Sequence, residues 1–125
     1  MWYIFPQARG LGASAMSQRY SIQDVGEAEA YLQHPVLGPH YRQLVDAVWY
    51  QVVERQVSLR SLFGSPDDAK LVSSLTLFAG IMDRLGHTDP ALETLLARAD
   101  QILGAAYAQG LARCTITEAF LTGYS

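Results

Sequence analysis

The chain has 125 residues, 50% of them hydrophobic and 17% charged, with a formal net charge of −3. This length predicts a single domain with one hydrophobic core, and the acidic balance argues against a general nucleic-acid binder. The single cysteine, Cys114, excludes a disulfide framework within the chain and a cysteine-only metal site. The apolar run MWYIF at the start lacks the features of a signal peptide and is too short to span a bilayer. We therefore expect a cytoplasmic protein without a membrane segment.

The first part of the chain predicts an extended segment, a loop and a helix. Residues 6–17 are rich in Gly, Ala and Ser and show little periodicity, which is typical of a loop. From Asp24 the apolar residues recur at helical spacing until Pro35, which stops the helix. The turn HPVLGP, residues 34–39, then leads to a second helix, in which Pro39 suits the first position.

The second helix is expected to run from Pro39 to Val53, and a short helix is expected around Leu59 to Phe63. The next segment, FGSPDD, is the strongest local signal in the chain. Ser65 can cap a helix that begins at Pro66, and the two following carboxylates favour the positive end of its dipole. One apolar face of this helix is expected to consist of Leu71, Leu75, Phe78, Met82 and Leu85.

A similar pair, Asp89-Pro90, opens a long helix that ends near Gly110, and residues 115–121 can form one more short helix. The predicted fold class is therefore all-α: a compact multihelical single domain, residues 1–125, with an extended N-terminal segment.

Gly10, Gly12 and Ala15 have the spacing G-x-G-x-x-A of a dinucleotide-binding turn. In that fold the glycines directly follow a strand, and a second parallel strand ends in an acidic residue about 20 residues on. Here residues 6–9 separate the apolar run from Gly10, and no further strand–helix–strand unit follows. We interpret the glycines as residues that allow a tight backbone turn.

Three blocks of the sequence stand out: MWYIFPQARGLGASAMSQRYSI, AEAYLQHPVLGPHYRQ and LFGSPDDAKLVSSLTLFA. In this order they resemble the bacterial family named domain of unknown function 1810 (DUF1810). The resemblance implies a small, all-helical cytosolic domain and no established activity, cofactor or catalytic residue. We expect the family-like region at residues 1–86 and a divergent helical tail at residues 87–125. Because the chain begins within the family's aromatic run, it resembles an N-terminally shortened member.

The N-terminal loop is the candidate ligand site. Backbone amides of a Gly/Ser loop and two arginines can hold an anion or a phosphate, whereas the alternative is a polar loop that faces solvent. With two residues of the later helices added, the candidate ligand-binding residues are Gln7, Arg9, Ser14, Gln18, Arg19, Tyr20, His34 and Lys70.

Two of these residues also have structural interpretations. His34 and His40 lie six residues apart without a nearby third ligand, so no metal is expected, and His34 is expected to cap the end of the first helix. Lys70 can pair with Asp67, three residues earlier on the same helix.

No complete catalytic set is visible in the sequence, so whether the protein is an enzyme stays open and no cofactor can be named. The first functional interpretation is a non-enzymatic association module. The alternatives are a protein that binds a small anionic metabolite or nucleotide derivative near the Gly10–Tyr20 loop, or an enzyme that uses such a pocket. Neither nucleic acid nor membrane is an expected partner.

We predict self-association, as a dimer. In the family pattern an upstream segment would pack near Trp2, Tyr3 and Phe5, and uncovered apolar surface on the order of a few hundred Å² usually binds a partner. Light scattering at micromolar protein concentration tests this prediction. A monomer in which Trp2 is shielded by its own chain would contradict it.

Overall fold

The structure is a computed structural model, and it describes residue 6 and residues 22–64, 67–85 and 90–122. This part of the chain forms six α-helices: α2 (Val25–Gln33), α3 (Leu37–Trp49), α4 (Leu59–Phe63), α5 (Asp67–Leu85), α6 (Pro90–Ala108) and α7 (Thr115–Thr122). A π-helical turn, η1 (Tyr50–Glu54), continues α3. The all-α prediction is confirmed. Ser65 and Pro66, the predicted cap of α5, lie outside the described residues.

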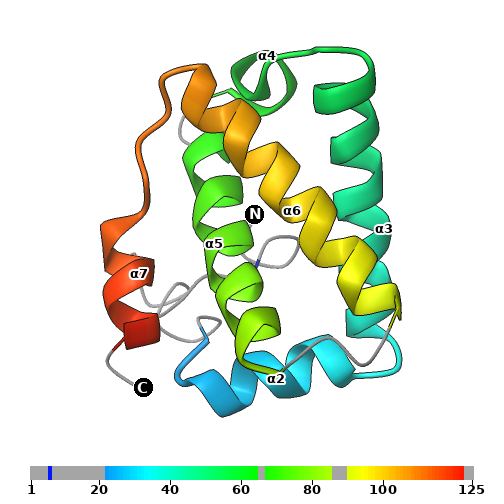
Figure 1. The fold of residues 1–125 in the computed structure, drawn as a ribbon, viewed down its shortest axis with the longest axis vertical. Helices are drawn as coiled ribbons and strands as arrows, with labels where there is room; N and C mark the ends of the chain where they lie inside the picture. Colours follow the sequence, from blue (N-terminus) through cyan, green and yellow to red (C-terminus); the bar gives the residue numbers. More distant parts are fainter. Residues whose placement is uncertain (1–5, 7–21, 65–66, 86–89, 123–125) are drawn as a thin grey trace.

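Helix α5 is the centre of the fold, and other helices surround it on several sides (Figure 1). Helix α6 crosses α5 obliquely and continues toward α3, and the short α7 packs beside α5, while α2 crosses near the C-terminal end of α5 and α4 lies near its N-terminal end. Helix α3 packs on α2 and α6. No helix in the described ranges has the length and apolar character that crossing a membrane requires.

The central position of α5 explains its burial pattern. The predicted apolar face is confirmed at Leu71, Leu75, Phe78 and Met82, which are at most 1% exposed. The side chain of Leu85, the fifth predicted member, lies outside the described part. The other sides of the helix are buried as well, including Val72, Leu77 and Ile81. Because neighbours surround α5, even its small polar residues Ser73 and Ser74 are buried.

The core also contains a hydrogen-bonded aromatic cluster. The ring centroids of Tyr41 and Phe78 lie 4.7 Å apart, and Tyr31 approaches both rings. The Tyr41 hydroxyl lies 2.9 Å from the Ser74 hydroxyl, so this buried phenol has a partner. Burial raises the pKa of Tyr41 above its ordinary value; the hydroxyl therefore stays protonated and joins α3 to α5.

A surface cluster strengthens the contact between α3 and α6. The guanidinium of Arg98 donates to Asp46 Oδ1 at 2.7 Å and lies over the Trp49 ring, 4.4 Å from its centroid. The Trp49 indole donates to the Gln101 side chain. These contacts orient α6 across α3.

The turn between α2 and α3 differs in detail from the prediction. Helix α2 begins after Asp24, where the helical spacing begins, and the Asp24 side chain accepts from the Glu27 amide at 2.7 Å. Helix α3 begins at Leu37 rather than Pro39, and Pro39 is tolerated because amides of the first turn need no intrahelical partner. Gly38 lets the two helices approach, since a Cβ there would lie 2.2 Å from the Leu32 carbonyl oxygen.

The end of the second predicted helix also differs in form. Its last residues, Tyr50–Glu54, form a π-helical turn in which the Arg55 amide donates to the Tyr50 carbonyl at 3.0 Å. The chain then leaves the helix through Gln56, which has a φ of 57°. Helical periodicity predicted the extent of this segment, but it does not distinguish an α-turn from a wider one.

We predict that Phe78→Ala lowers the free energy of unfolding by about 3–5 kcal/mol, because it empties a fully enclosed site between Tyr31 and Tyr41. Tyr50→Ala is the matched control: Tyr50 is 53% exposed, and its removal should change stability by about 0.5 kcal/mol or less. Chemical denaturation measures both variants. Equal stabilities would disprove the assignment of Phe78 to the core.

Candidate functional site

The structure describes two of the eight candidate ligand-binding residues. Gln7, Arg9, Ser14, Gln18, Arg19 and Tyr20 lie outside the described residues. His34 ends α2, and Lys70 lies in the first turn of α5 with its ammonium 3.8 Å from Asp67 Oδ1, the predicted pair. The two depressions that His34 lines do not include Lys70 among their described lining residues.

His34 acts on the helix that follows it. Its backbone forms the C-cap of α2, as expected, but its side chain does not donate to the carbonyls of that helix. Instead, Nδ1 accepts hydrogen bonds from the amides of Val36 at 3.1 Å and Leu37 at 3.2 Å. The imidazole thus satisfies amides at the start of α3, which explains why this helix begins before Pro39.

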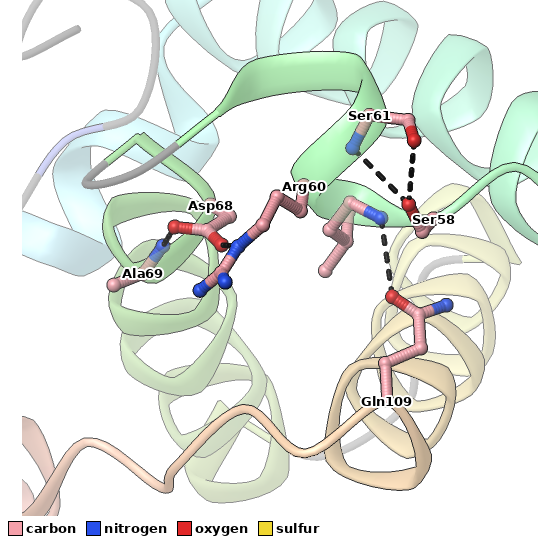
Figure 2. Close-up of polar contacts among 7 residues, drawn as sticks. Ser58, Arg60, Ser61, Asp68, Ala69 and Gln109 are labelled. Atoms are coloured by element: carbon pink, nitrogen blue, oxygen red, sulfur yellow. Dashed lines mark hydrogen bonds and ion pairs between the residues drawn. The ribbon is translucent and has the colours of Figure 1, made fainter.

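A polar pocket of about 430 Å³ lies where the starts of α4 and α5 meet the end of α6. Figure 2 shows its polar contacts. The described residues that line it are Ser58, Arg60, Asp68, Gln109, Gly110 and Leu111.

The wall formed by α4 is fixed by hydrogen bonds at its first turn. Ser58 caps the helix, and its hydroxyl accepts from the Ser61 amide at 3.1 Å (Figure 2). The Leu59 amide, which such a cap leaves without an intrahelical partner, donates to Gln109 Oε1 at 3.1 Å. Gln109 therefore connects the start of α4 to the end of α6.

Asp68 supplies a buried charge at the wall formed by α5. Its side chain is 2% exposed. Oδ1 accepts from the Ala69 amide at 2.8 Å, and Oδ2 accepts from Arg60 Nε at 3.4 Å (Figure 2). The second contact is long, because hydrogen bonds between charged partners usually measure about 2.7–2.9 Å. Among the described residues Oδ2 has no closer donor.

Arg60, the partner of Asp68, is largely in solvent. Its side chain is 72% exposed and contacts the carboxylate through Nε alone. Figure 2 shows no contact of its two terminal nitrogens to the residues drawn. The planar end of the guanidinium can therefore bind a carboxylate or phosphate through two parallel hydrogen bonds.

The sequence analysis did not identify this pocket. It interpreted Asp68 as a carboxylate that favours the start of α5; in the structure Asp68 does lie there, but it is also buried beside Arg60. Arg60 and Gln109 were missed, because neither belongs to a motif. A weak signal existed in the opposite charges of Arg60, which lies three residues before the FGSPDD segment, and Asp68, which ends it.

Other polar groups do not form a second reactive cluster in the part of the chain that the structure covers. Within that part no group of three or more His, Cys, Asp or Glu residues could hold a metal ion. Cys114 is half-buried, with its sulfur 3.1 Å from the hydroxyls of both Ser73 and Thr117. Partial burial raises the pKa of the Asp100 carboxyl, and the negative charge of the nearby Asp83 raises it further.

The fold and the pocket together define a small all-helical domain with a polar cavity between three helix ends. The matching family model is described as "Protein of unknown function (DUF1810)", and it covers residues 1–104. The chain belongs to this family, as its three sequence blocks indicated. The match ends within α6, Pro90–Ala108.

A solved structure supports the same relationship. The chain is similar to the conserved hypothetical protein Rv1873 from Mycobacterium tuberculosis, with 37% sequence identity and a TM-score of 0.61. The similarity covers 86% of this chain and 74% of the mycobacterial chain. No curated protein matches the sequence.

We predict that Gln109→Ala weakens the junction between α4 and α6. The Leu59 amide would lose its acceptor, and an unpaired, partly buried amide costs about 1–3 kcal/mol. Hydrogen exchange of the Leu59 amide measures the effect, which should be faster in this variant than in Gln109→Glu, whose side chain keeps an acceptor oxygen. Unchanged exchange in Gln109→Ala would contradict the assignment.

Proposed function

We propose that this protein is a binding domain for a small ligand that carries both an amino group and an acid group, and that it binds this ligand in the pocket of Figure 2. The observation that carries the proposal is Asp68. Its buried carboxylate lines a cavity, and Oδ2 has only one long contact, to an exposed arginine.

The ammonium group of the ligand is assigned to Asp68. A buried carboxylate is costly unless donors compensate its charge, and the 3.4 Å contact to Arg60 Nε compensates it weakly. A primary ammonium that enters the cavity can donate to Oδ2 at a shorter distance. This would improve the environment of Asp68 and stabilise the folded protein.

The acid group of the ligand is assigned to Arg60. The terminal nitrogens of this guanidinium are open, while its Nε remains beside Asp68. A carboxylate matches the planar fork of these two nitrogens. Asp68 then acts as the positioning residue that holds the guanidinium at the rim of the pocket.

The charges of the pocket also disfavour simpler ligands. Its described lining contains one acidic and one basic side chain. A ligand that carries one positive and one negative group can therefore pair each group with a side chain of opposite charge. A simple anion would lie near the Asp68 carboxylate, and a simple cation near the Arg60 guanidinium, and both are repelled. The volume of about 430 Å³ is within the usual range of about 300–1,000 Å³ for small-molecule pockets.

This proposal takes up the ligand-binding alternative of the sequence analysis and changes the ligand from an anion to a zwitterion. Self-association remains a second candidate. It is supported by Val36 and Leu37, neighbouring apolar residues that are 52% and 39% exposed, and the light-scattering measurement above tests it.

We predict that calorimetric titration finds binding of one or more free amino acids, and weaker binding of the amine or the carboxylic acid with the same side chain. Asp68→Asn should weaken binding at least about tenfold, because it removes the charge opposite the ammonium. Arg60→Gln should weaken it similarly. At about 100 times its dissociation constant the ligand should stabilise the fold by about 2.7 kcal/mol.

Arg55→Gln is the matched control. Arg55 is an exposed arginine that donates to Gln51 Oε1 and does not line the pocket, so this change removes the same charge and should leave affinity unchanged. Circular dichroism verifies that each variant folds. The proposal is wrong if no amino acid binds, or if neither Asp68→Asn nor Arg60→Gln changes the affinity.

A further inference from the structure

We infer that the turn between α2 and α3 forms a second site, which binds an oxyanion of the phosphate class and does not depend on the amino-acid pocket proposed above. The site is a depression of about 260 Å³ between this turn and the first turns of α6. Its described lining consists of Leu32, Gln33, His34, Pro35, Pro39, Arg42 and Leu92.

Arg42 is the basis of this inference. Of the arginines that the structure describes, Arg42 alone has neither a hydrogen bond nor an ion pair. Arg98 and Arg113, for example, each donate to a carboxylate at 2.7 Å. Arg42 is half-buried and lines a concave surface. A positive group in that position is suited to an external anion.

His34 supplies a second donor of fixed direction. Because Nδ1 accepts from the amides of Val36 and Leu37, the proton of the neutral imidazole is on Nε2. Among the described residues Nε2 has no acceptor. The same bonds hold the ring in place, so the imidazole is oriented before any ligand binds.

The backbone of the turn adds to this preorganisation. Pro35 and Pro39 restrict its torsion angles, and Gly38 lies against the end of α2 so closely that no side chain fits there. Together with Leu92 of α6, the prolines form apolar walls.

The chemistry of the lining selects an oxyanion. The open groups are donors, namely the guanidinium of Arg42 and Nε2 of His34, and the described lining contains no Asp or Glu. A cation would find no carboxylate there. A tetrahedral oxyanion offers several acceptor oxygens at once, so it can accept from both side chains. The amide of Gln33, which is exposed at the rim, can donate to the same group.

The described linings of this site and of the amino-acid pocket share no residue. The pocket lies near the start of α5 and the end of α6, whereas the depression lies at the start of α3 and of α6. The two proposals can therefore be tested separately. If phosphate does not bind, the proposal of an amino-acid site is unaffected.

The test is a titration of the ¹⁵N-labelled protein with inorganic phosphate at low ionic strength, followed by two-dimensional NMR. We expect the largest shifts among the amides of residues 33–42. Arg42→Gln should weaken binding at least about tenfold. His34→Asn should weaken it several-fold and keep the fold, because the Asn side-chain oxygen can still accept from the amides of the turn while the Nε2 donor is lost.

Arg55→Gln, which removes the same charge from an exposed arginine outside the depression, should bind phosphate like the unaltered protein. A second titration with a phosphate monoester, glycerol 3-phosphate, distinguishes the source of the group: tighter binding assigns the site to a phosphorylated metabolite, and equal binding assigns it to free phosphate. Absence of shifts in residues 33–42, or unaltered affinity in Arg42→Gln, would overturn the inference.

Discussion

The enclosure of α5 is the constraint on which the rest of the structure depends. A helix surrounded by neighbours must be apolar on most of its sides, and each polar group that it retains needs a partner. Ser74 meets the Tyr41 hydroxyl, Ser73 meets Cys114, and Asp68 meets Arg60. In the described part of the chain no buried side-chain nitrogen or oxygen lacks a partner. Of these three contacts, only that of Asp68 borders an open pocket and is long for a charged pair.

The two proposed sites both lie at helix ends, and the reason is general. The first amides and the last carbonyls of a helix have no intrahelical partners, so side chains from elsewhere must satisfy them. Gln109 does this for α4, and His34 does it for α3. These hydrogen bonds orient the side chains that make them. The grooves between the helix ends can hold a small ligand. The proposals of ligand binding therefore rest on this geometry.

Much of the fold was predictable because its signals are local. Asp24 caps α2, and a helix was expected and found at Leu59–Phe63. The apolar face that includes Phe78 lies in the core. The errors were local as well. Pro39 does not begin α3, because the imidazole of His34 satisfies the amides of the earlier residues, and the end of that helix widens into a π-turn.

The sequence by itself determined the helices, the family and the central apolar stripe, since spacing and caps depend on residues a few positions apart. Only the tertiary structure decided the pocket. Gln109 meets Leu59 across 50 residues, and Arg60 reaches Asp68 around the turn that precedes α5. It also decided that Arg42 has no ionic partner among the described residues, while Arg98 reaches Asp46 across 52 residues. Helix packing brings segments that are distant in the sequence together. The order of charges along the sequence therefore does not predict which side chains will pair.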